Sequence, residues 1–273
     1  MNGYFPGGYL KLKDKKIIEI IEKPKPEKRP SNIVRLVVDY FADFADFIAV
    51  AKKIKDLNQD GVYEKILNIY LNKVKTEYID YQDYWYFLKY PWNALSVNKF
   101  FLSKINSSFI GEKVYIDRTA KIEGIVYLEE GVKIHEYAKI AGPCYLGKNS
   151  IIGNYSLVRE SMIGSNSVVG GYCEVARSYL GENVWLHRNY IGDSVIENNV
   201  LFGAGAVLAN FRFDEKEVKS KIKEAWLNTN FNKMGAIIGS KVKIGVNSSI
   251  MPGIKIGSNN LVGPHVLIKE DIL

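Results

Sequence analysis

The feature that most constrains the fold of this chain is a six-residue repeat of aliphatic residues. Its first members stand six residues apart and are Ile116, Ile122, Leu128, Ile134, Ile140, Leu146, Ile152 and Val158. The repeat continues with single-residue slips through Ile163, Val169, Val175, Leu180, Leu186, Ile191, Ile196, Phe202 and Leu208, and resumes from Ile238 to Ile268. Such a period, sustained over this length, predicts a parallel β-helix in which three hexads form one triangular coil.

The residues before the repeat have a mixed pattern. We expect a small α+β region over 1–103 and the β-helix over 104–273. In the first region, "GGYLKLKDKKIIEIIEKP" reads as a β-hairpin and "IVRLVVDYF" as a buried strand. Three segments carry apolar residues at helical spacing: "ADFADFIAVAKKI", "GVYEKILNIYLNKV" and "PWNALSVNKFFLSKI".

Composition narrows the classes of function. The 273 residues are 47% hydrophobic, which supports a proper core, and no apolar run reaches the ~18 residues that span a bilayer. The opening residues lack a signal-peptide pattern, and the two cysteines, Cys144 and Cys173, suit a reducing cytoplasm. The net charge of +7 fits either a heat-adapted, Lys/Ile-rich composition or a phosphorylated small-molecule partner. Because the basic residues are dispersed, neither a nucleic acid nor a membrane is expected as partner.

Two interruptions of the repeat stand out as candidate functional segments. Between Leu208 and Ile238 the hexads disappear, and the lysine-rich sequence there predicts a projecting loop or ribbon. At "LHRNYIGDSV" the repeat slips by one residue, and His187 stands three residues before Tyr190. We expect His187 to point outward, toward solvent or another subunit, where it either has a chemical role or fills a corner or subunit seam.

The sequences of these segments resemble a known family. "HRNYIGDSVIENNVLFGAGAVLANFRFDEKEVK" and "KMGAIIGSKVKIGVNSSIMPGIKIGS" resemble the C-terminal part of the bifunctional sugar-1-phosphate nucleotidylyltransferase/amino-sugar-1-phosphate N-acetyltransferases of the archaeal type. "IIEIIEKPKPEKRPSN" and "YPWNALSVN" resemble the last third of the nucleotidyltransferase domain of the same enzymes. The resemblance implies a left-handed β-helix, acetyl-CoA as cosubstrate, no required metal, and a homotrimer.

The resemblance also implies roles for individual residues. His187 matches the catalytic base, and Asn210 a residue near the acetyl group. Substrate contacts are expected from Arg159, Tyr190, Arg177, Lys216 and Lys219, and cofactor contacts from Ala204, Ala236 and Val246. The chain departs from the family at Ala176, where a phosphate-binding lysine is usual, and at Leu201, where a sugar-binding asparagine is usual. His135 and His265 are expected to be structural or surface residues.

The chemistry of N-acetylation requires the same residue types. An ammonium group must lose a proton before it attacks a thioester, and imidazole accepts protons near neutral pH. An amide or backbone N–H group can stabilise the developing oxyanion. Arginine and lysine bind the phosphate of a sugar phosphate. We therefore expect a CoA-dependent N-acetyltransferase acting on an amino-sugar 1-phosphate.

Nucleotidyl transfer is not expected. The glycine-rich nucleotide loop of that family is missing, and Phe87 and Lys89 stand in "YWYFLKYPWN" where a metal-binding aspartate and a glycine are usual. Glu22 and Lys23 match a sugar-contacting "EKP" but are expected to be vestigial. The alternative reading is a non-catalytic partner subunit of a full-length bifunctional enzyme, a reading that Ala176 and Leu201 favour.

Overall fold

The computed structural model describes residues 5–14 and 16–273 and divides the chain into two compact units, Met1–Tyr84 and Trp85–Leu273. The first unit contains an antiparallel hairpin of β1 (Gly8–Lys13) and β2 (Lys16–Glu22), a 3₁₀ turn η1 (Pro26–Lys28), and helices α1 (Phe44–Ala51) and α2 (Val62–Leu71). Its core forms where one face of the hairpin meets α1 and α2, through Leu10, Ile20, Phe47, Val50, Ile66 and Leu67. The predicted hairpin and the first two predicted helices are confirmed.

The predicted buried strand in this unit is wrong. Of the segment "IVRLVVDYF", only Val34 forms a bridge, to Tyr9, whereas Val37 and Val38 are exposed. Val37 adopts a positive φ of 59°, which breaks an extended conformation. The buried member of the segment is instead the polar Arg35, which forms ion pairs with Asp39 and Glu64.

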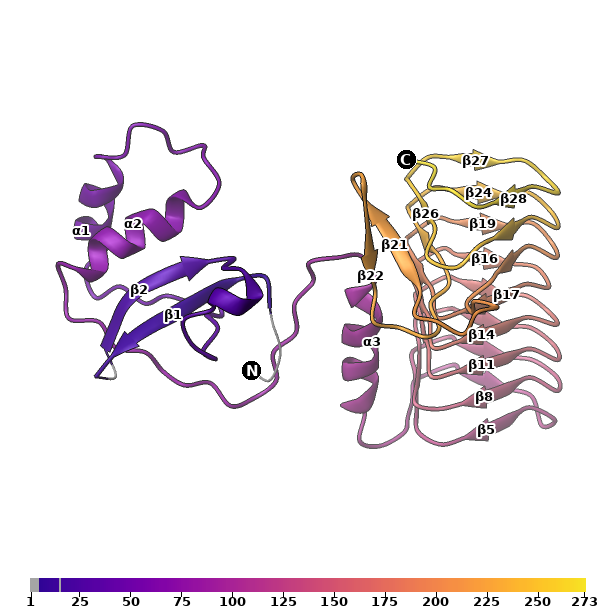
Figure 1. Cartoon of the computed structure of the whole chain (residues 1–273). Helices are drawn as coiled ribbons and strands as arrows, with labels where there is room; N and C mark the ends of the chain where they lie inside the picture. Colours follow the sequence, from indigo (N-terminus) through magenta and orange to yellow (C-terminus); the bar gives the residue numbers. More distant parts are fainter. Residues whose placement is uncertain (1–4, 15) are drawn as a thin grey trace. The chain divides into compact units, whose positions relative to one another are not determined.

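The second unit is a parallel β-helix, as predicted (Figure 1). Three eight-stranded parallel sheets form the faces of its coils, and we call them faces A, B and C in the order in which the chain visits them from Tyr115 onward; the first strand, at Phe109–Ile110, belongs to face C. Face A contains β4 (Tyr115–Ile116), β7 (Lys133–Ile134), β10 (Ile151–Ile152), β13 (Val168–Val169), β16 (Trp185–Leu186), β19 (Leu201–Phe202), β24 (Lys243–Ile244) and β27 (Leu261–Val262). Face B contains β5 (Lys121–Glu123), β8 (Lys139–Ala141), β11 (Leu157–Arg159), β14 (Glu174–Ala176), β17 (Tyr190–Gly192), β20 (Val207–Leu208), β25 (Ser249–Ile250) and β28 (Leu267–Ile268). Face C contains β3 (Phe109–Ile110), β6 (Val126–Leu128), β9 (Cys144–Leu146), β12 (Met162–Ile163), β15 (Tyr179–Leu180), β18 (Val195–Ile196), β23 (Ile237–Ile238) and β26 (Lys255–Ile256).

The aliphatic repeat forms the core of this helix. Its members from Leu128 to Leu208 are at most 1% exposed and stack coil upon coil in one continuous cluster. Asparagine recurs at the turns because several turns need a left-handed residue, such as Asn149, Asn166 and Asn183 with φ of 55–57°. Asparagine tolerates this region better than most side chains do.

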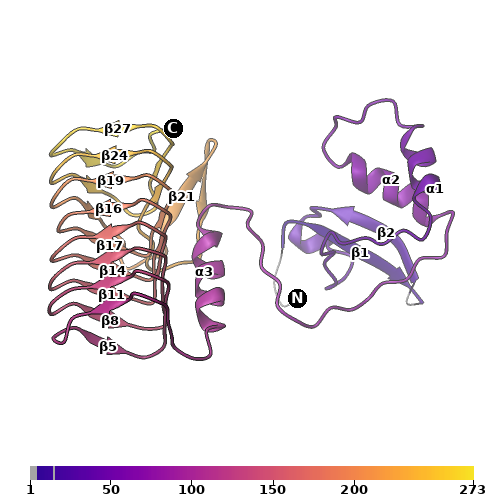
Figure 2. The same ribbon diagram turned by 180° about the vertical axis from the view of Figure 1, so that it is seen from behind.

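Helix α3 (Asn93–Ser103) lies in the same compact unit as the β-helix, Trp85–Leu273 (Figures 1 and 2). It packs beside β15, and the buried side chains of Trp92 and Leu95 join Val195, Val218 and Met234 in a second apolar cluster. The repeat itself still starts close to the expected position, at β3. No helix within the described residues has the length and apolar character needed to cross a membrane.

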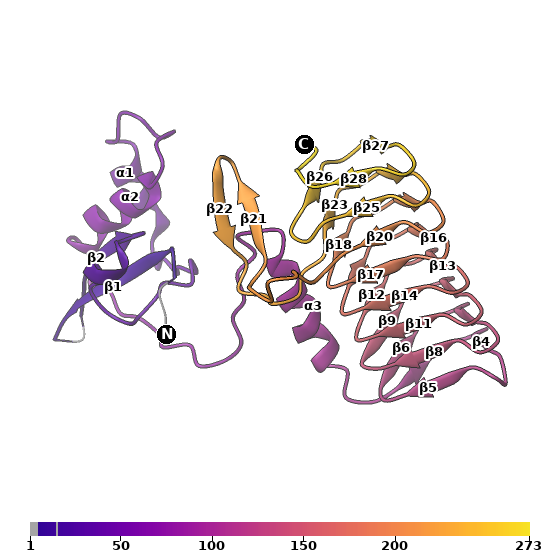
Figure 3. The same ribbon diagram turned by 45° about the vertical axis from the view of Figure 1, so that its right-hand side comes forward.

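The insertion between β20 and β23 forms a projecting ribbon, as predicted. Strands β21 (Lys219–Ile222) and β22 (Ala225–Asn228) pair as an antiparallel hairpin (Figure 3). Lys255 holds the middle of strand β21, because its ammonium group contacts Ser220 Oγ, the carbonyl oxygen of Lys221 and the carboxylate of Asp271. The insertion is thereby anchored to one of the last coils.

Candidate active site

His187 lies at a corner of the β-helix that differs from its neighbours. The corners between faces A and B contain four residues in every coil but one, and the exception is the three-residue corner His187–Asn189 between β16 and β17. The slip seen in the repeat is therefore a shortened corner. The imidazole of His187 is exposed at this corner, as expected from the sequence.

The residue that fixes this corner is Asn189, which the sequence analysis did not single out. Its side chain is 3% exposed and accepts a hydrogen bond from the backbone N–H of His187. Its Nδ2 donates to the carbonyl oxygens of Gly203 and Ala206 in the next coil, at 2.9 Å each. These bonds satisfy a buried amide and hold the backbone of His187 in one position. The corresponding corner position of the other coils holds an aliphatic or small residue. The asparagine at this position was therefore the signal that could have identified it.

Glycine residues, which have no side chain, flank His187 in the preceding and the following coil. Strand register places Gly170 and Gly203 at the equivalent position in the preceding and following coils. Added Cβ atoms there would come within 2.4 Å of the Leu186 carbonyl oxygen and 2.6 Å of the Val246 nitrogen, so side chains are excluded. His187 is therefore accessible from neighbouring coils along this edge.

Two of the predicted cofactor residues lie along the same edge. Ala204 and Val246 occupy the next two corners, both are exposed, and their carbonyl oxygens accept hydrogen bonds from Asn247 and His265 at 2.9 Å. Among the described residues no hydrogen-bond partner is found for their backbone N–H groups, so these can donate to a ligand. The third, Ala236, does not fit this role. It is fully buried on face C, its N–H donates to Ser194 Oγ and its carbonyl accepts from Val195.

A second group of predicted residues meets at the opposite edge of face B, between faces B and C. Asp193 is 7% exposed and receives two hydrogen bonds from Arg177, from Nε at 2.6 Å and from Nη2 at 2.7 Å. Asn210 Nδ2 donates to the same carboxylate at 2.5 Å. The hydrogen bond to Asp193 is the main cause that raises the pKa of Arg177. Asp193 was not among the predicted residues, although it joins two of them.

Tyr190 lies on face B between the two edges. Its hydroxyl and Asn210 Nδ2 converge over Gly192, where an added Cβ would lie 2.8 Å and 2.5 Å from these atoms. Arg159 stands in register with Ala176 and Gly192 on the same face, and its Nη2 pairs with Glu174 at 3.0 Å. Tyr190, Asn210, Arg177 and Arg159 therefore line one continuous part of face B.

The structure does not bring every predicted residue together within one chain. His187 precedes β17 and Asn210 binds the corner that follows it, so the two lie at opposite edges of face B. Lys216 and Lys219 are exposed on the insertion. Leu201 lies on face A, next to the exposed Trp185. Ala176 is fully buried and offers no side-chain contact at the surface of face B.

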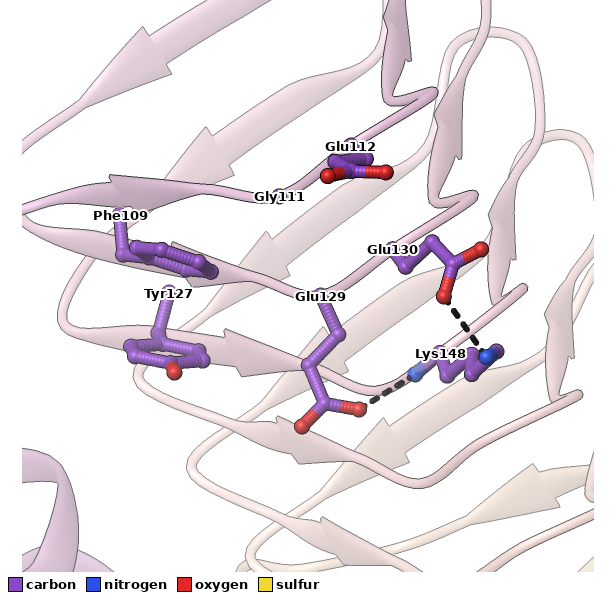
Figure 4. A pocket seen from close by; sticks show the side chains of 7 residues that line it. All are labelled: Phe109, Gly111, Glu112, Tyr127, Glu129, Glu130 and Lys148. Atoms are coloured by element: carbon purple, nitrogen blue, oxygen red, sulfur yellow. Dashed lines mark hydrogen bonds and ion pairs between the residues drawn. The ribbon is translucent and has the colours of Figure 1, made fainter.

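A separate hollow of about 370 Å³ lies at the first coils (Figure 4). It is lined by Phe109, Gly111, Glu112, Tyr127, Glu129, Glu130 and Lys148. The Lys148 ammonium pairs with Glu130 at 2.7 Å, and the stacked rings of Phe109 and Tyr127 form another wall. None of the predicted site residues lines it, so we assign it no part in the chemistry at His187. Within the described residues there is no group of three or more His, Cys, Asp or Glu side chains that could hold a metal ion.

Comparison with known proteins identifies similar domains and similar proteins. Residues 104–201 match the model of the GMPPB C-terminal domain, and residues 235–270 match the bacterial transferase hexapeptide model (six repeats). A bifunctional protein GlmU of Methanococcus maripaludis is 36% identical over 278 residues, covering 95% of this chain and 62% of the relative. A bifunctional sugar-1-phosphate nucleotidylyltransferase/acetyltransferase of Sulfurisphaera tokodaii is 35% identical over 266 residues, covering 93% of this chain and 63% of the relative.

Among solved structures, a UDP-N-acetylglucosamine acyltransferase from Campylobacter jejuni is 16% identical with a TM-score of 0.39, covering 60% of this chain and 69% of the other. A likeness this distant carries no argument here. The chain spans 62% of the length of the bifunctional protein GlmU of Methanococcus maripaludis. The similarity covers both the hexad repeat of this chain and the residues that precede the repeat. The resemblance noted in the sequence is confirmed: over almost its whole length the chain is similar to bifunctional sugar-1-phosphate nucleotidylyltransferase/acetyltransferases, and its residues 235–270 match the hexapeptide repeat of bacterial transferases.

Proposed function

We propose that this chain is a CoA-dependent N-acetyltransferase that acts on an amino-sugar 1-phosphate, of the glucosamine-1-phosphate or galactosamine-1-phosphate type. The observation that carries this proposal is the shortened corner at His187. It presents an accessible imidazole between glycine positions, beside corner amides that are free to bind a ligand. The names of the relatives, which include acetyltransferase, support the reaction class.

In the proposed reaction, the nitrogen of the acceptor amine attacks the thioester carbon of acetyl-CoA, and His187 accepts a proton from this amine. The C–S bond breaks, the proton held by His187 passes to the departing sulfur so that CoA leaves as the thiol, and the product is the N-acetylated sugar phosphate. Asn210 is proposed to lie near the acetyl group, and free N–H groups such as those of Ala204 and Val246 are suited to the amide oxygens of the CoA arm. Arg159, Tyr190, Lys216 and Lys219 are proposed to contact the acceptor. Arg177 is proposed to hold the side chain of Asp193 in position, because its Nε and Nη2 both donate hydrogen bonds to that carboxylate.

The separation of His187 and Asn210 across face B supports a shared site. In a closed ring of three chains, one edge of face B can approach a neighbouring copy, so that residues of both copies meet around one acceptor. We therefore propose a homotrimer.

We further propose that nucleotidyl transfer is absent. Phe87 stands where the family has a metal-binding carboxylate and packs against the ring of Trp85, with centroids 5.7 Å apart. A phenyl ring provides no oxygen ligand for the Mg²⁺ that positions nucleotide phosphates.

The experiment that tests the proposed function is release of free CoA thiol from acetyl-CoA with glucosamine-1-phosphate or galactosamine-1-phosphate as acceptor. Acceptor-dependent thiol release would support it. The second candidate function, a non-catalytic partner subunit, is favoured by the buried Ala176 and by Leu201 on face A. That reading predicts no thiol release with either acceptor and co-purification with a full-length bifunctional enzyme.

A further inference from the structure

The arginines that the sequence places at the acceptor site are largely engaged within the chain. Arg177 makes a bidentate ion pair with Asp193, at 2.6 Å and 2.7 Å. Arg159 pairs with Glu174 through Nη2 at 3.0 Å. Ala176 is fully buried and carries no charge. Face B therefore offers less free positive charge to a phosphate than the predicted residues suggested.

Arg188, which was not predicted as a site residue, differs from Arg159 and Arg177 in that its guanidinium group is not engaged in an ion pair within the described residues. It directly follows His187 and is exposed. Within the described part of the chain, no hydrogen bond or ion pair to its guanidinium is found, in contrast to Arg159, Arg177 and Arg212 of the same unit. A guanidinium with five unused N–H donors suits a phosphate, which it can bind in a bidentate manner.

The shortened corner determines where this guanidinium lies. Arg188 has a φ of 52°, a conformation that Tyr137, Tyr155 and Tyr172 share at the corresponding position of the three preceding coils. The three tyrosine rings stack on one another at 5.0 Å and 5.1 Å, and Tyr172, at the end toward Arg188, is 65% exposed. Arg188 does not continue this stack. Its Nη2 extends toward the following coil, 3.8 Å from the point where a Cβ would stand on Gly205.

We propose that Arg188 binds the phosphate of the acceptor sugar, an inference that rests on the proposed function. In a 2-amino-sugar 1-phosphate the amine and the phosphate are on adjacent carbons, so an amine at His187 brings the phosphate within reach of the next side chain in the sequence. The phosphates of CoA are separated from its thioester by the whole pantetheine arm. A guanidinium beside the base is therefore better placed for the acceptor than for the acyl donor.

The test compares Arg188→Asn with wild-type protein. Asparagine is chosen because it tolerates the positive φ of this position. The KM for glucosamine-1-phosphate should rise about 10- to 100-fold, the loss typical of a charged hydrogen-bonded contact, while the KM for acetyl-CoA changes less than about threefold. Arg188→Lys should recover part of the affinity, because it restores the charge without the bidentate geometry.

The matched control is Arg118→Ala, which removes a positive charge from the same edge four coils away, about 19 Å at the strand spacing of a β-sheet. It should leave both KM values unchanged. A rise in KM confined to acetyl-CoA, or equal rises in Arg188→Asn and Arg118→Ala, would overturn the inference. So would an unchanged KM for the acceptor in Arg188→Asn.

Calorimetric titration with glucosamine-1-phosphate and with glucosamine separates this inference from the proposed function. Wild-type protein should prefer the phosphorylated sugar, and Arg188→Asn should lose that preference. If the wild type binds the sugar phosphate through Arg188 but releases no thiol, the inference stands and the acetyltransferase proposal fails. If the wild type acetylates the sugar and titration shows equal preference in both proteins, the inference fails alone.

Discussion

At the scale of single residues, His187 is defined by its surroundings more than by its own contacts. A buried asparagine fixes its backbone, and glycine positions on either side keep the space around its imidazole open. Because an exposed side chain on a β-helix adds little to the core, the chemical and structural roles of this residue can be separated by substitution.

We predict that His187→Ala lowers kcat by about 10²- to 10⁴-fold, the usual contribution of a general base, with little change in melting temperature. Steady-state kinetics and calorimetry on the same preparations measure both quantities. His265→Ala is the matched control, because His265 is an exposed histidine at the last corner of the same edge. A fall in activity of similar size in both variants would argue against a specific role for His187.

The two cysteines lead to a prediction about thiol reactivity. Cys144 is fully buried, and burial raises the pKa of its thiol to about 11, while burial also raises the pKa of Cys173. Because the thiolate is the reactive form, neither thiol should react with a disulfide reagent at pH 7 in the folded protein. Both should react after denaturation. Rapid native-state labelling would show that one of these positions opens.

Single residues also explain how much of the site could be predicted from the sequence. The sequence identified the exposed His187, because a lone histidine interrupts a strict aliphatic repeat. It assigned no role to Asn189, Asp193 or Arg188, because their roles depend on which coil lies above or below them. Nor did it show that Ala236 is inaccessible, since burial at that position depends on how the chain returns from the insertion to face C.

At the scale of elements, strand β17 connects the two groups of site residues. Gly192, at its end, leaves space in which the Tyr190 hydroxyl and Asn210 Nδ2 converge. The order of residues along this one strand therefore positions the groups proposed to contact the acceptor.

We predict that Gly192→Ala displaces Tyr190 and Asn210, since the new methyl group would lie 2.8 Å and 2.5 Å from their polar atoms. The KM for the acceptor should rise, and overpacking should lower the free energy of unfolding by about 1–3 kcal/mol. Gly263→Ala is the control, because its nearest neighbour would be an ordinary contact at 3.7 Å. Unfolding in denaturant measures the stabilities, and equal stabilities of the two variants would contradict this packing.

The hairpin β21–β22 depends on Lys255, whose side chain is 12% exposed and whose partner Asp271 is 10% exposed. Lys255→Met should lower the free energy of unfolding by roughly 3–5 kcal/mol, because it leaves the largely buried Asp271 carboxylate without its ion-pair partner, while the backbone N–H of residue 255 still donates to it. The double variant Lys255→Met/Asp271→Leu should be less destabilised than the single one. Denaturant unfolding of both proteins tests this order, and a double variant less stable than Lys255→Met would contradict it.

The elements also show where sequence patterns are reliable. The hexad repeat determined the β-helix because every coil repeats the same packing requirement, and the loss of hexads between Leu208 and Ile238 correctly indicated a projecting loop or ribbon. The apolar segment "IVRLVVDYF" was misread because hydrophobicity alone does not reveal a positive φ at Val37. Helix α3 was recognised, but its place in the β-helical unit depends on a contact with β15 that lies far away in the sequence.

At the scale of the whole molecule, the separation of His187 and Asn210 requires an explanation. We predict that the protein is a homotrimer, with a mass by light scattering of about three times 30.9 kDa. A monomer at micromolar concentration would contradict both the trimer and a site shared between copies.

The proposed absence of nucleotidyl transfer is also tested on the whole chain. Incubation with UTP or dTTP, a sugar 1-phosphate and Mg²⁺ should release no pyrophosphate above background, because Phe87 provides no ligand for the metal. Turnover at about 1 s⁻¹, ordinary for an enzyme, would contradict this prediction.

The most direct measurement is thiol release from acetyl-CoA by the wild-type protein and by His187→Ala, with glucosamine-1-phosphate and galactosamine-1-phosphate as acceptors. We predict acceptor-dependent release by the wild type with at least one of the two sugars, and a fall of about 10²- to 10⁴-fold in the variant. Equal acceptor-dependent rates in the two proteins would contradict general-base catalysis by His187, and no release by either protein would favour the non-catalytic partner.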